Sequence, residues 1–276
     1  MIKNELENLV QVMKELRDPT VGCEWDKRQT FESIVPYTIE EAYEVADAID
    51  NKDYVALKEE LGDLLLQVVF HSQMAEEINE FNINDVINTV ISKLRNRHPH
   101  IYNTKEVENL SDLETNWEKI KAREREVKAL SQGKDISVLD NIPNNLPSII
   151  RAEKLQKRAA TIGFDWDDID LVFAKVLEEI EELKDEINAA NDSERILDES
   201  GDLLFACVNV LRHLNINPEV ALRAANHKFE RRFRILESLL GSNGTQKNIH
   251  PQELNILWEK AKTIIRQSHD TNESQN

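Results

Sequence analysis

The sequence predicts an all-α protein built from two tandem, related helical-bundle modules. Apolar residues recur at helical spacing along most of the 276 residues, and no segment has a convincing strand pattern. The chain contains only seven glycines and seven prolines, too few for a turn-rich β-sandwich. An acidic motif also occurs twice, at corresponding places in the two halves. The length is sufficient for two domains of ordinary size.

The first module is predicted to cover residues 1–130. Its first helix shows apolar residues at helical spacing from Ile2 to Leu16 and ends at Asp18-Pro19, because proline cannot continue a helix. Pro99 stops a later helix in the same way. The helices of this module are expected at about residues 2–17, 40–51, 60–79, 84–97 and 113–130.

Residues 131–147 are predicted to form a linker, since they contain one glycine and two prolines among polar residues. The helical pattern restarts at residue 148, and the second module is expected to cover residues 148–267. Its last two helices are predicted at about residues 218–240 and 252–266. The polar tail, residues 268–276, is predicted to be disordered.

The chain is organised around acidic pairs on consecutive helices. Glu41 and Glu44 are three residues apart and therefore share a helix face, as do Glu60 and Asp63 on the next predicted helix. If these helices pack antiparallel, four carboxylates converge. Such a cluster repels itself unless a hard cation fills it, and Mg²⁺ prefers oxygen ligands. The alternative is that an acidic helix face is simply solvated surface.

Repetition of the motif argues against the surface alternative. A glycine inside each acidic helix recurs as well, at Gly62 and Gly201. Because glycine costs about 1 kcal/mol relative to alanine inside a helix, we expect another group to approach the backbone closely there. The second copy of the acidic motif comprises Glu179, Glu182, Glu199 and Asp202.

Basic and aromatic residues recur too. On a helix, lysine and arginine are usually surface residues whose stems cover apolar groups, and tryptophan is usually a core residue. Beside a metal-filled cluster, however, basic side chains would neutralise the oxygens of a triphosphate, and tryptophan could stack on a base. The repeated residues are Lys93, Arg97, Trp117 and Lys121 in the first half, and Lys228, Arg232, Trp258 and Lys262 in the second.

Several classes of protein are disfavoured. A formal net charge of −18 argues against general nucleic-acid binding. Cys23 and Cys207 form no Cys-x-x-Cys motif, which argues against a zinc-thiolate site and a disulfide framework. No glycine-rich phosphate loop and no Glu-x-x-His pair of a di-iron bundle is present. His98 and His100, which flank Pro99, are interpreted as fixing a loop rather than binding metal.

The sequence also predicts where the protein resides. Its N-terminus lacks an apolar segment followed by a cleavage site, and no uninterrupted apolar run approaches ~20 residues. We therefore expect a cytoplasmic protein that does not interact with membranes.

Glu-x-x-Glu followed by Glu-x-x-Asp on consecutive helices resembles the all-α nucleoside triphosphate pyrophosphohydrolases. The duplicated Trp-Asp and Gly-Asp-Leu-Leu motifs, Arg-His-Pro-His and Lys-Phe-Glu-Arg-Arg-Phe are similar to the MazG family over residues 6–262. The resemblance implies modules of the all-α NTP pyrophosphatase type and a homodimer. It also implies broad hydrolysis of ribo- and deoxyribonucleoside triphosphates to the monophosphate and pyrophosphate. Two or more Mg²⁺ ions per active site, with Mn²⁺ able to substitute, are the implied cofactors.

Carried onto this chain, the resemblance assigns roles to the repeated residues. In the first Trp-Asp loop, Glu24 stands where the family usually has proline. Lys228, Arg231, Arg232 and Lys262 would hold the triphosphate, with Trp258 near the nucleoside. The implied metal ligands are Glu41, Glu44, Glu60 and Asp63 in the first module, and Glu179, Glu182, Glu199 and Asp202 in the second.

The mechanism implied is hydrolysis by metal-activated water. Mg²⁺ polarises the phosphate chain and lowers the pKa of a bound water, and a carboxylate of the cluster, Glu44 or Glu182, takes the proton. Attack at the α- or the β-phosphorus remains open. Asn96 stands where the second module has Arg231, so the second module is expected to be the stronger catalyst. The alternative is that one module is catalytic and the other senses nucleotide or docks a protein.

Overall fold

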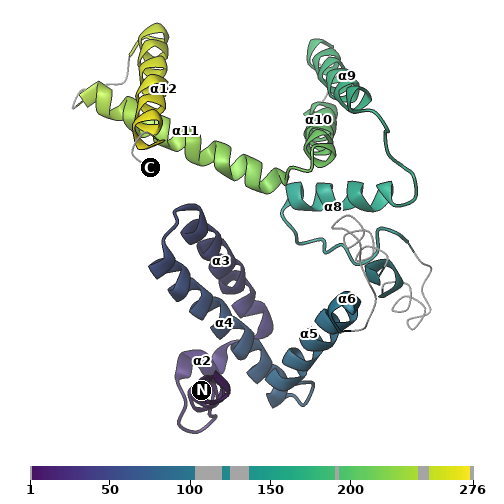
Figure 1. The fold of residues 1–276 in the computed structure, drawn as a ribbon, viewed down its shortest axis with the longest axis vertical. Coiled ribbons are helices and arrows are strands. Elements are labelled where there is room, and N and C mark those ends of the chain that lie inside the picture. The colour runs from purple at the N-terminus through teal and green to yellow at the C-terminus, as the bar shows by residue number, and fades with distance from the viewer. Residues whose placement is uncertain (1, 103–119, 125–136, 190–192, 242–248, 274–276) are drawn as a thin grey trace. The chain divides into compact units, whose positions relative to one another are not determined.

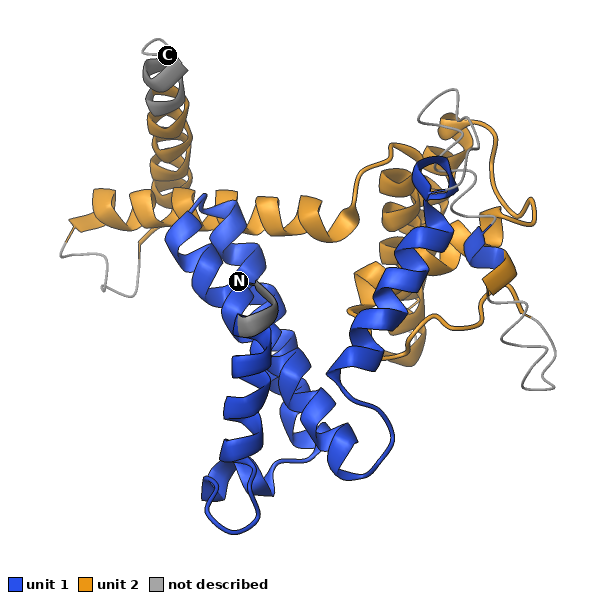
Figure 2. Ribbon diagram, turned by 60° about the horizontal axis from the view of Figure 1, so that its bottom comes forward, with its two compact units in different colours: residues 1–122 blue, residues 123–276 orange. Residues whose placement is uncertain are grey.

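The computed structural model describes residues 2–102, 120–124, 137–189, 193–241 and 249–273. Throughout these residues the regular structure is helical, without strands, which confirms the predicted all-α class (Figure 1). The chain divides into two compact units, residues 1–122 and 123–276 (Figure 2). The linker predicted at residues 131–147 lies partly outside the described residues, and its boundaries stay a prediction. No helix in the described ranges is both long and apolar enough to span a membrane.

The first unit contains six described helices. The third helix begins at Phe31, although the sequence predicts a helix only from residue 40. Thr30 explains the earlier start, because its hydroxyl accepts from the Ser33 amide and the Ser33 hydroxyl accepts from the Thr30 amide. The bounds are α1 (Ile2–Leu16), α2 (Glu24–Arg28), α3 (Phe31–Asp50), α4 (Tyr54–Glu77), α5 (Ile83–Arg97) and α6 (Pro99–Tyr102).

A tight turn pairs α3 with α4. Lys52 adopts a positive φ of 56°, and the Asp53 carboxylate accepts from the amides of Val55 and Ala56, both at 3.0 Å, to cap α4. The chain therefore reverses within three residues, and α4 packs antiparallel along α3. This reversal brings the acidic face of α4 opposite that of α3.

The second unit repeats this helix pair, with α9 and α10 in place of α3 and α4. Its final helix extends to Glu273, so the disorder predicted from residue 268 is wrong as far as Glu273. The segment is polar but contains no glycine or proline to end a helix. The bounds are α8 (Ser148–Ala160), α9 (Ile169–Asn188), α10 (Ser193–His213), α11 (Pro218–Leu240) and α12 (Pro251–Glu273).

The core of the first unit lies where α1 packs on α3 and α4. Beside it, Arg17 forms hydrogen bonds of 2.8 and 2.7 Å to the carboxylate of Glu77 and stacks over the Phe70 ring at 5.3 Å. These contacts fix α1 against the C-terminal half of α4. The core comprises Met13, Ile34, Val69, Phe70 and Met74.

The two helix glycines do not have the predicted role. A Cβ atom placed on Gly62 or Gly201 would meet nothing within 4 Å among the described residues. The described residues therefore make no close approach to either glycine, and both glycines face open space.

Candidate metal centres and a polar-lined pocket

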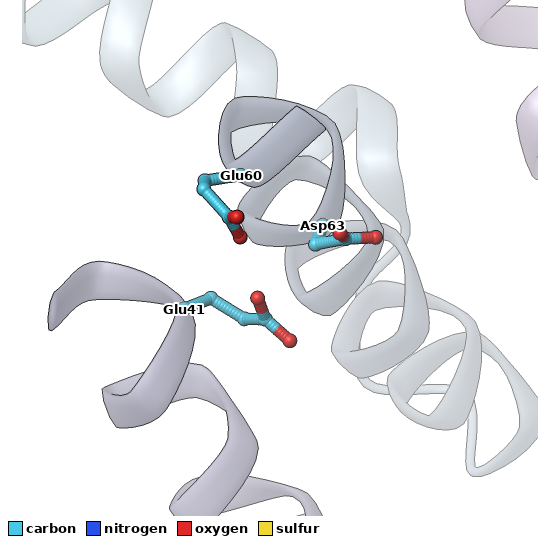
Figure 3. A group of neighbouring side chains, drawn as sticks. All are labelled: Glu41, Glu60 and Asp63. Carbon is cyan, nitrogen blue, oxygen red and sulfur yellow. The ribbon is translucent and has the colours of Figure 1, made fainter. Parts of the chain in front are cut away.

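The first carboxylate cluster lies between α3 and α4. Glu41 projects from α3, whereas Glu60 and Asp63 project from the same face of α4, within one helical turn (Figure 3). One carboxylate oxygen from each lies within 4.8 Å of the others. The predicted convergence of acidic faces is therefore present for these three residues. A set of oxygen ligands at this spacing suits a hard divalent cation.

The pKa values of this cluster show its electrostatic strain. The pKa of Glu41 is raised, first by burial and then by the nearby charges of Asp63 and Glu44. Burial also raises the pKa of Glu60, followed by repulsion from Glu44 and Asp63. Glu44 thus lies beside the cluster, although it is outside the group of three that could share one ion. A bound cation would relieve this repulsion.

The second cluster has the same construction between α9 and α10. Glu179 is only 5% exposed, and one of its oxygens lies within 4.8 Å of oxygens of Glu199 and Asp202. The pKa of Glu199 is raised by burial and then by Glu182 and Asp202. Glu182 therefore occupies the same peripheral place that Glu44 has in the first cluster.

A lysine distinguishes the second cluster from the first. Lys175 Nζ lies 2.8 Å from Glu179 Oε1 and 2.9 Å from Glu178 Oε1, and these hydrogen bonds raise the pKa of the lysine. The position four residues before Glu41 is occupied by Tyr37 instead. Lys175 is not among the residues predicted from the sequence, although its i, i+4 spacing from Glu179 is a signal for such a pair.

Beside the second cluster lies a pocket of about 520 Å³. Phe164, Trp166 and Phe205 contribute apolar walls, and two carboxylates of the cluster line the same space. The pocket thus combines an apolar space with a metal-ligand set. Its polar lining residues are Gln156, Asp165, Lys175, Glu179, Asp202, Asn209 and Arg212.

An ion-pair network fixes one wall of this pocket. Arg212 Nη1 donates to Asp165 Oδ2 at 2.9 Å, its Nη2 contacts Asp165 Oδ1, and His213 Nε2 lies 2.9 Å from the same carboxylate. Hydrogen bonds from Arg212 are the first cause of the lowered pKa of Asp165. The network ties the loop that carries Trp166 to α10. The neighbouring Trp-Asp pair is a repeated motif of the sequence, whereas Asp165 carries no such signal.

The predicted substrate-binding residues of the second module lie on α11 and α12, and none lines this pocket. The Trp258 ring lies 5.4 Å from the Phe229 ring, and Lys262 Nζ lies 2.6 Å from Glu259. Lys228 and Arg231 are exposed, whereas Arg232 is half-buried. Their role in holding a triphosphate stays a prediction.

Their counterparts in the first module lie on or after α5. Lys93 is exposed and Arg97 half-buried on α5, and Lys121 is half-buried within residues 120–124. Trp117 lies outside the described residues. The substrate-binding role of this set also stays a prediction.

The fold and the clusters define a class: an all-α protein whose two helix pairs each carry three carboxylates able to share a metal ion. The MazG nucleotide pyrophosphohydrolase domain matches residues 29–102 and 169–234, which include both clusters. This chain belongs to the MazG family.

Its relatives include curated proteins that align along nearly their whole length. The chain is 46% identical to the nucleoside triphosphate pyrophosphohydrolase of Escherichia coli K12, over 94% of this chain and 97% of that protein. It is 44% identical to the nucleoside triphosphate pyrophosphohydrolase/pyrophosphatase MazG of Thermotoga maritima, over 93% of this chain and 95% of that protein.

Proposed function

We propose that this protein hydrolyses ribo- and deoxyribonucleoside triphosphates to nucleoside monophosphate and pyrophosphate, and that its principal active site is the second cluster. The observation that carries this proposal is that Glu179 and Asp202 belong both to the carboxylate cluster and to the lining of the apolar pocket. A nucleoside in the pocket would place its phosphates next to the metal ligands. The two aligned relatives are named nucleoside triphosphate pyrophosphohydrolases, which supports the proposed reaction.

The donor set fits Mg²⁺, with Mn²⁺ as a substitute, because all its ligand atoms are carboxylate oxygens. Glu179, Glu199 and Asp202 would hold the ion, and Glu182 would complete the ligand set for a second one. When bound, the cation would neutralise phosphate charge and lower the pKa of a water molecule. The same ligand set is available in the first module, in Glu41, Glu60 and Asp63 with Glu44 beside them.

The side chains of the second cluster divide the remaining work. Lys175 holds Glu179 in place through its 2.8 Å contact and brings a positive charge to the pocket lining. Glu182 is exposed and lies beside Glu199, where a carboxylate can accept the proton of an attacking water. We assign Glu182 as the general base and Glu44 as its counterpart in the first module.

The proposed reaction is tested by product analysis. Purified protein is incubated with ATP and with dCTP, in Mg²⁺ and in EDTA, and pyrophosphate and orthophosphate are quantified separately. We expect equimolar monophosphate and pyrophosphate in Mg²⁺ and none in EDTA, since the carboxylates alone cannot activate water. Orthophosphate as the main product, or no release from any nucleoside triphosphate, would contradict the proposal.

A sensing or docking role for the first module is the second candidate. It is supported by the packing of that module, where the Trp25 ring lies edge-on to the buried Phe70 ring at 6.5 Å and close to the Tyr37 ring at 6.1 Å. By their spacing from the repeated motifs, Trp25, Tyr37 and Phe70 correspond to Trp166, Lys175 and Asn209, which line the second-module pocket. The first module therefore carries different side chains at these positions, which favours a role other than catalysis.

We also propose that the protein forms a homodimer. Leu177, Leu197 and Leu204 on the α9–α10 pair are 64%, 71% and 66% exposed, and burying these large apolar side chains in an interface would stabilise association. We expect sedimentation to give about twice the chain mass, and Leu204→Glu to shift the protein toward monomer. As a control, Leu171→Glu makes the same substitution at another exposed leucine, near the start of α9, and should leave the dimer intact. A monomeric wild-type protein would refute the proposal.

A further inference from the structure

Lys175 on α9 is shared between two glutamates that have different surroundings. Its Nζ lies 2.8 Å from Glu179 Oε1 and 2.9 Å from Glu178 Oε1. Glu179 is buried and belongs to the second carboxylate cluster, whereas Glu178 is exposed and is not one of the carboxylates of that cluster. The ammonium group therefore contacts one ligand of the proposed metal site and one surface carboxylate.

A cation bound to Glu179 has to share this carboxylate with the ammonium group. Two positive charges on one carboxylate lie close together and repel each other, most strongly where apolar walls limit screening by water. Both Lys175 and Glu179 line the largely apolar second-module pocket. The lysine has a flexible stem and is half-buried, so it can leave Glu179 and keep its contact with Glu178. Lys175 and a cation are therefore alternative partners of Glu179.

The first module builds its cluster without an ammonium group at the corresponding position. Tyr37 stands where the second module has Lys175, four residues before Glu41. Glu41 instead accepts from the neutral amide of Gln67, whose Nε2 lies 3.5 Å from Glu41 Oε1. Oxygens of three carboxylates nevertheless lie within 4.8 Å of one another in this module. A lysine is therefore not needed to gather the carboxylates.

We propose that Lys175 acts as an internal counter-ion of the second cluster, which competes with a divalent cation for Glu179 and lowers the metal affinity of the nucleotide-free protein. The proposal rests on the proposed function, because it takes Glu179, Glu199 and Asp202 to be the metal ligands. Glu179 is 5% exposed on a helix that packs along α10, so packing already holds its position. The positive charge of Lys175 therefore matters more for metal affinity than its hydrogen bond does.

Titration with Mn²⁺ in the absence of nucleotide tests this inference. All proteins carry Asp63→Asn, which removes a ligand of the first cluster, and the electron paramagnetic resonance signal reports the free ion. We expect Lys175→Gln, which keeps a hydrogen-bond donor but loses the charge, to lower the dissociation constant for Mn²⁺ by about 10- to 100-fold. Lys175→Arg keeps the charge and should stay within about threefold of the Asp63→Asn protein.

Two further proteins locate the effect. Lys184→Gln removes an equal charge from the same helix, at an exposed pair with Glu181, and should change the dissociation constant by less than about twofold. Adding Asp202→Asn to Lys175→Gln should abolish the gain in affinity, because the second cluster then lacks a ligand. An unchanged or weaker affinity in folded Lys175→Gln, or an equal gain in Lys184→Gln, would overturn the proposal.

Pyrophosphate release from the wild-type protein decides the proposed reaction separately. Tighter Mn²⁺ binding by Lys175→Gln without any pyrophosphate release by the wild type would refute the reaction and support the counter-ion role. Pyrophosphate release by the wild type together with an unchanged Mn²⁺ affinity in Lys175→Gln would do the reverse.

Discussion

Replacing Asp202 with asparagine is expected to lower the turnover of ATP by about 100- to 1,000-fold, whereas Asp63→Asn should keep more than about half of the activity. Both residues occupy the same position in their carboxylate clusters, but Asp202 also lines the pocket. The substitution removes one anionic ligand with almost no change in size. Initial rates of pyrophosphate release over a range of Mg²⁺ concentrations measure the effect.

Glu182→Gln and Glu44→Gln extend this comparison to the proposed base. A lost metal ligand should raise the Mg²⁺ concentration needed for half-maximal rate. A lost base should lower kcat by roughly 10²- to 10⁴-fold even at saturating Mg²⁺. Because Glu182 is proposed both as the base and as a ligand of a second ion, we expect Glu182→Gln to lower kcat at saturating Mg²⁺ and also to raise the Mg²⁺ requirement, with little effect of Glu44→Gln. Full activity in both Asp202→Asn and Glu182→Gln would exclude the second cluster as the active site.

Arg212→Met is expected to reduce the free energy of unfolding of the second unit by about 2 kcal/mol at neutral pH. The Arg212 side chain is 11% exposed and that of Asp165 is 26% exposed, so the change leaves a largely buried carboxylate without its main partner. It also removes the donor that orients Asn209. Urea unfolding followed by far-UV circular dichroism measures the loss. Arg234→Met, at an exposed pair with Glu230, should change stability by less than about 0.5 kcal/mol.

The Arg212–Asp165 ion pair also predicts how the difference in unfolding free energy between wild type and Arg212→Met depends on pH. The folded-state pKa of Asp165 lies below the ordinary value of 3.8, so its ion pair stabilises the fold at every pH above that value. The stabilisation is lost as the pH falls through the lowered folded-state pKa. The gap in unfolding free energy between wild type and Arg212→Met should therefore narrow below about pH 3.8, as Asp165 becomes protonated. A gap that widens on acidification would contradict the assigned ion pair.

Local patterns predicted most of the helices and the candidate metal ligands. Glu60 and Asp63 share a face of α4 because both lie within one helical turn, which spacing alone determines. The start of α3 is predicted too late, because the capping interaction of Thr30 with Ser33 begins the helix at Phe31, before the acidic motif that marks it in the sequence. The neighbours of Gly62 could not be predicted, because a glycine does not reveal whether other side chains fill the space beside it.

The sequence by itself determined the all-α class, the duplication and which carboxylates share a helix face, since helical periodicity depends on residues three or four apart. The tertiary structure decided what surrounds those carboxylates. Arg212 meets Asp165 across 47 residues, and Gln156 meets Phe205 across 49. Such contacts depend on how whole helices pack and on the volumes of the side chains between them. Two modules with the same acidic motif therefore differ in their surroundings: Tyr37 stands where the second module has Lys175, and the second cluster adjoins a largely apolar pocket.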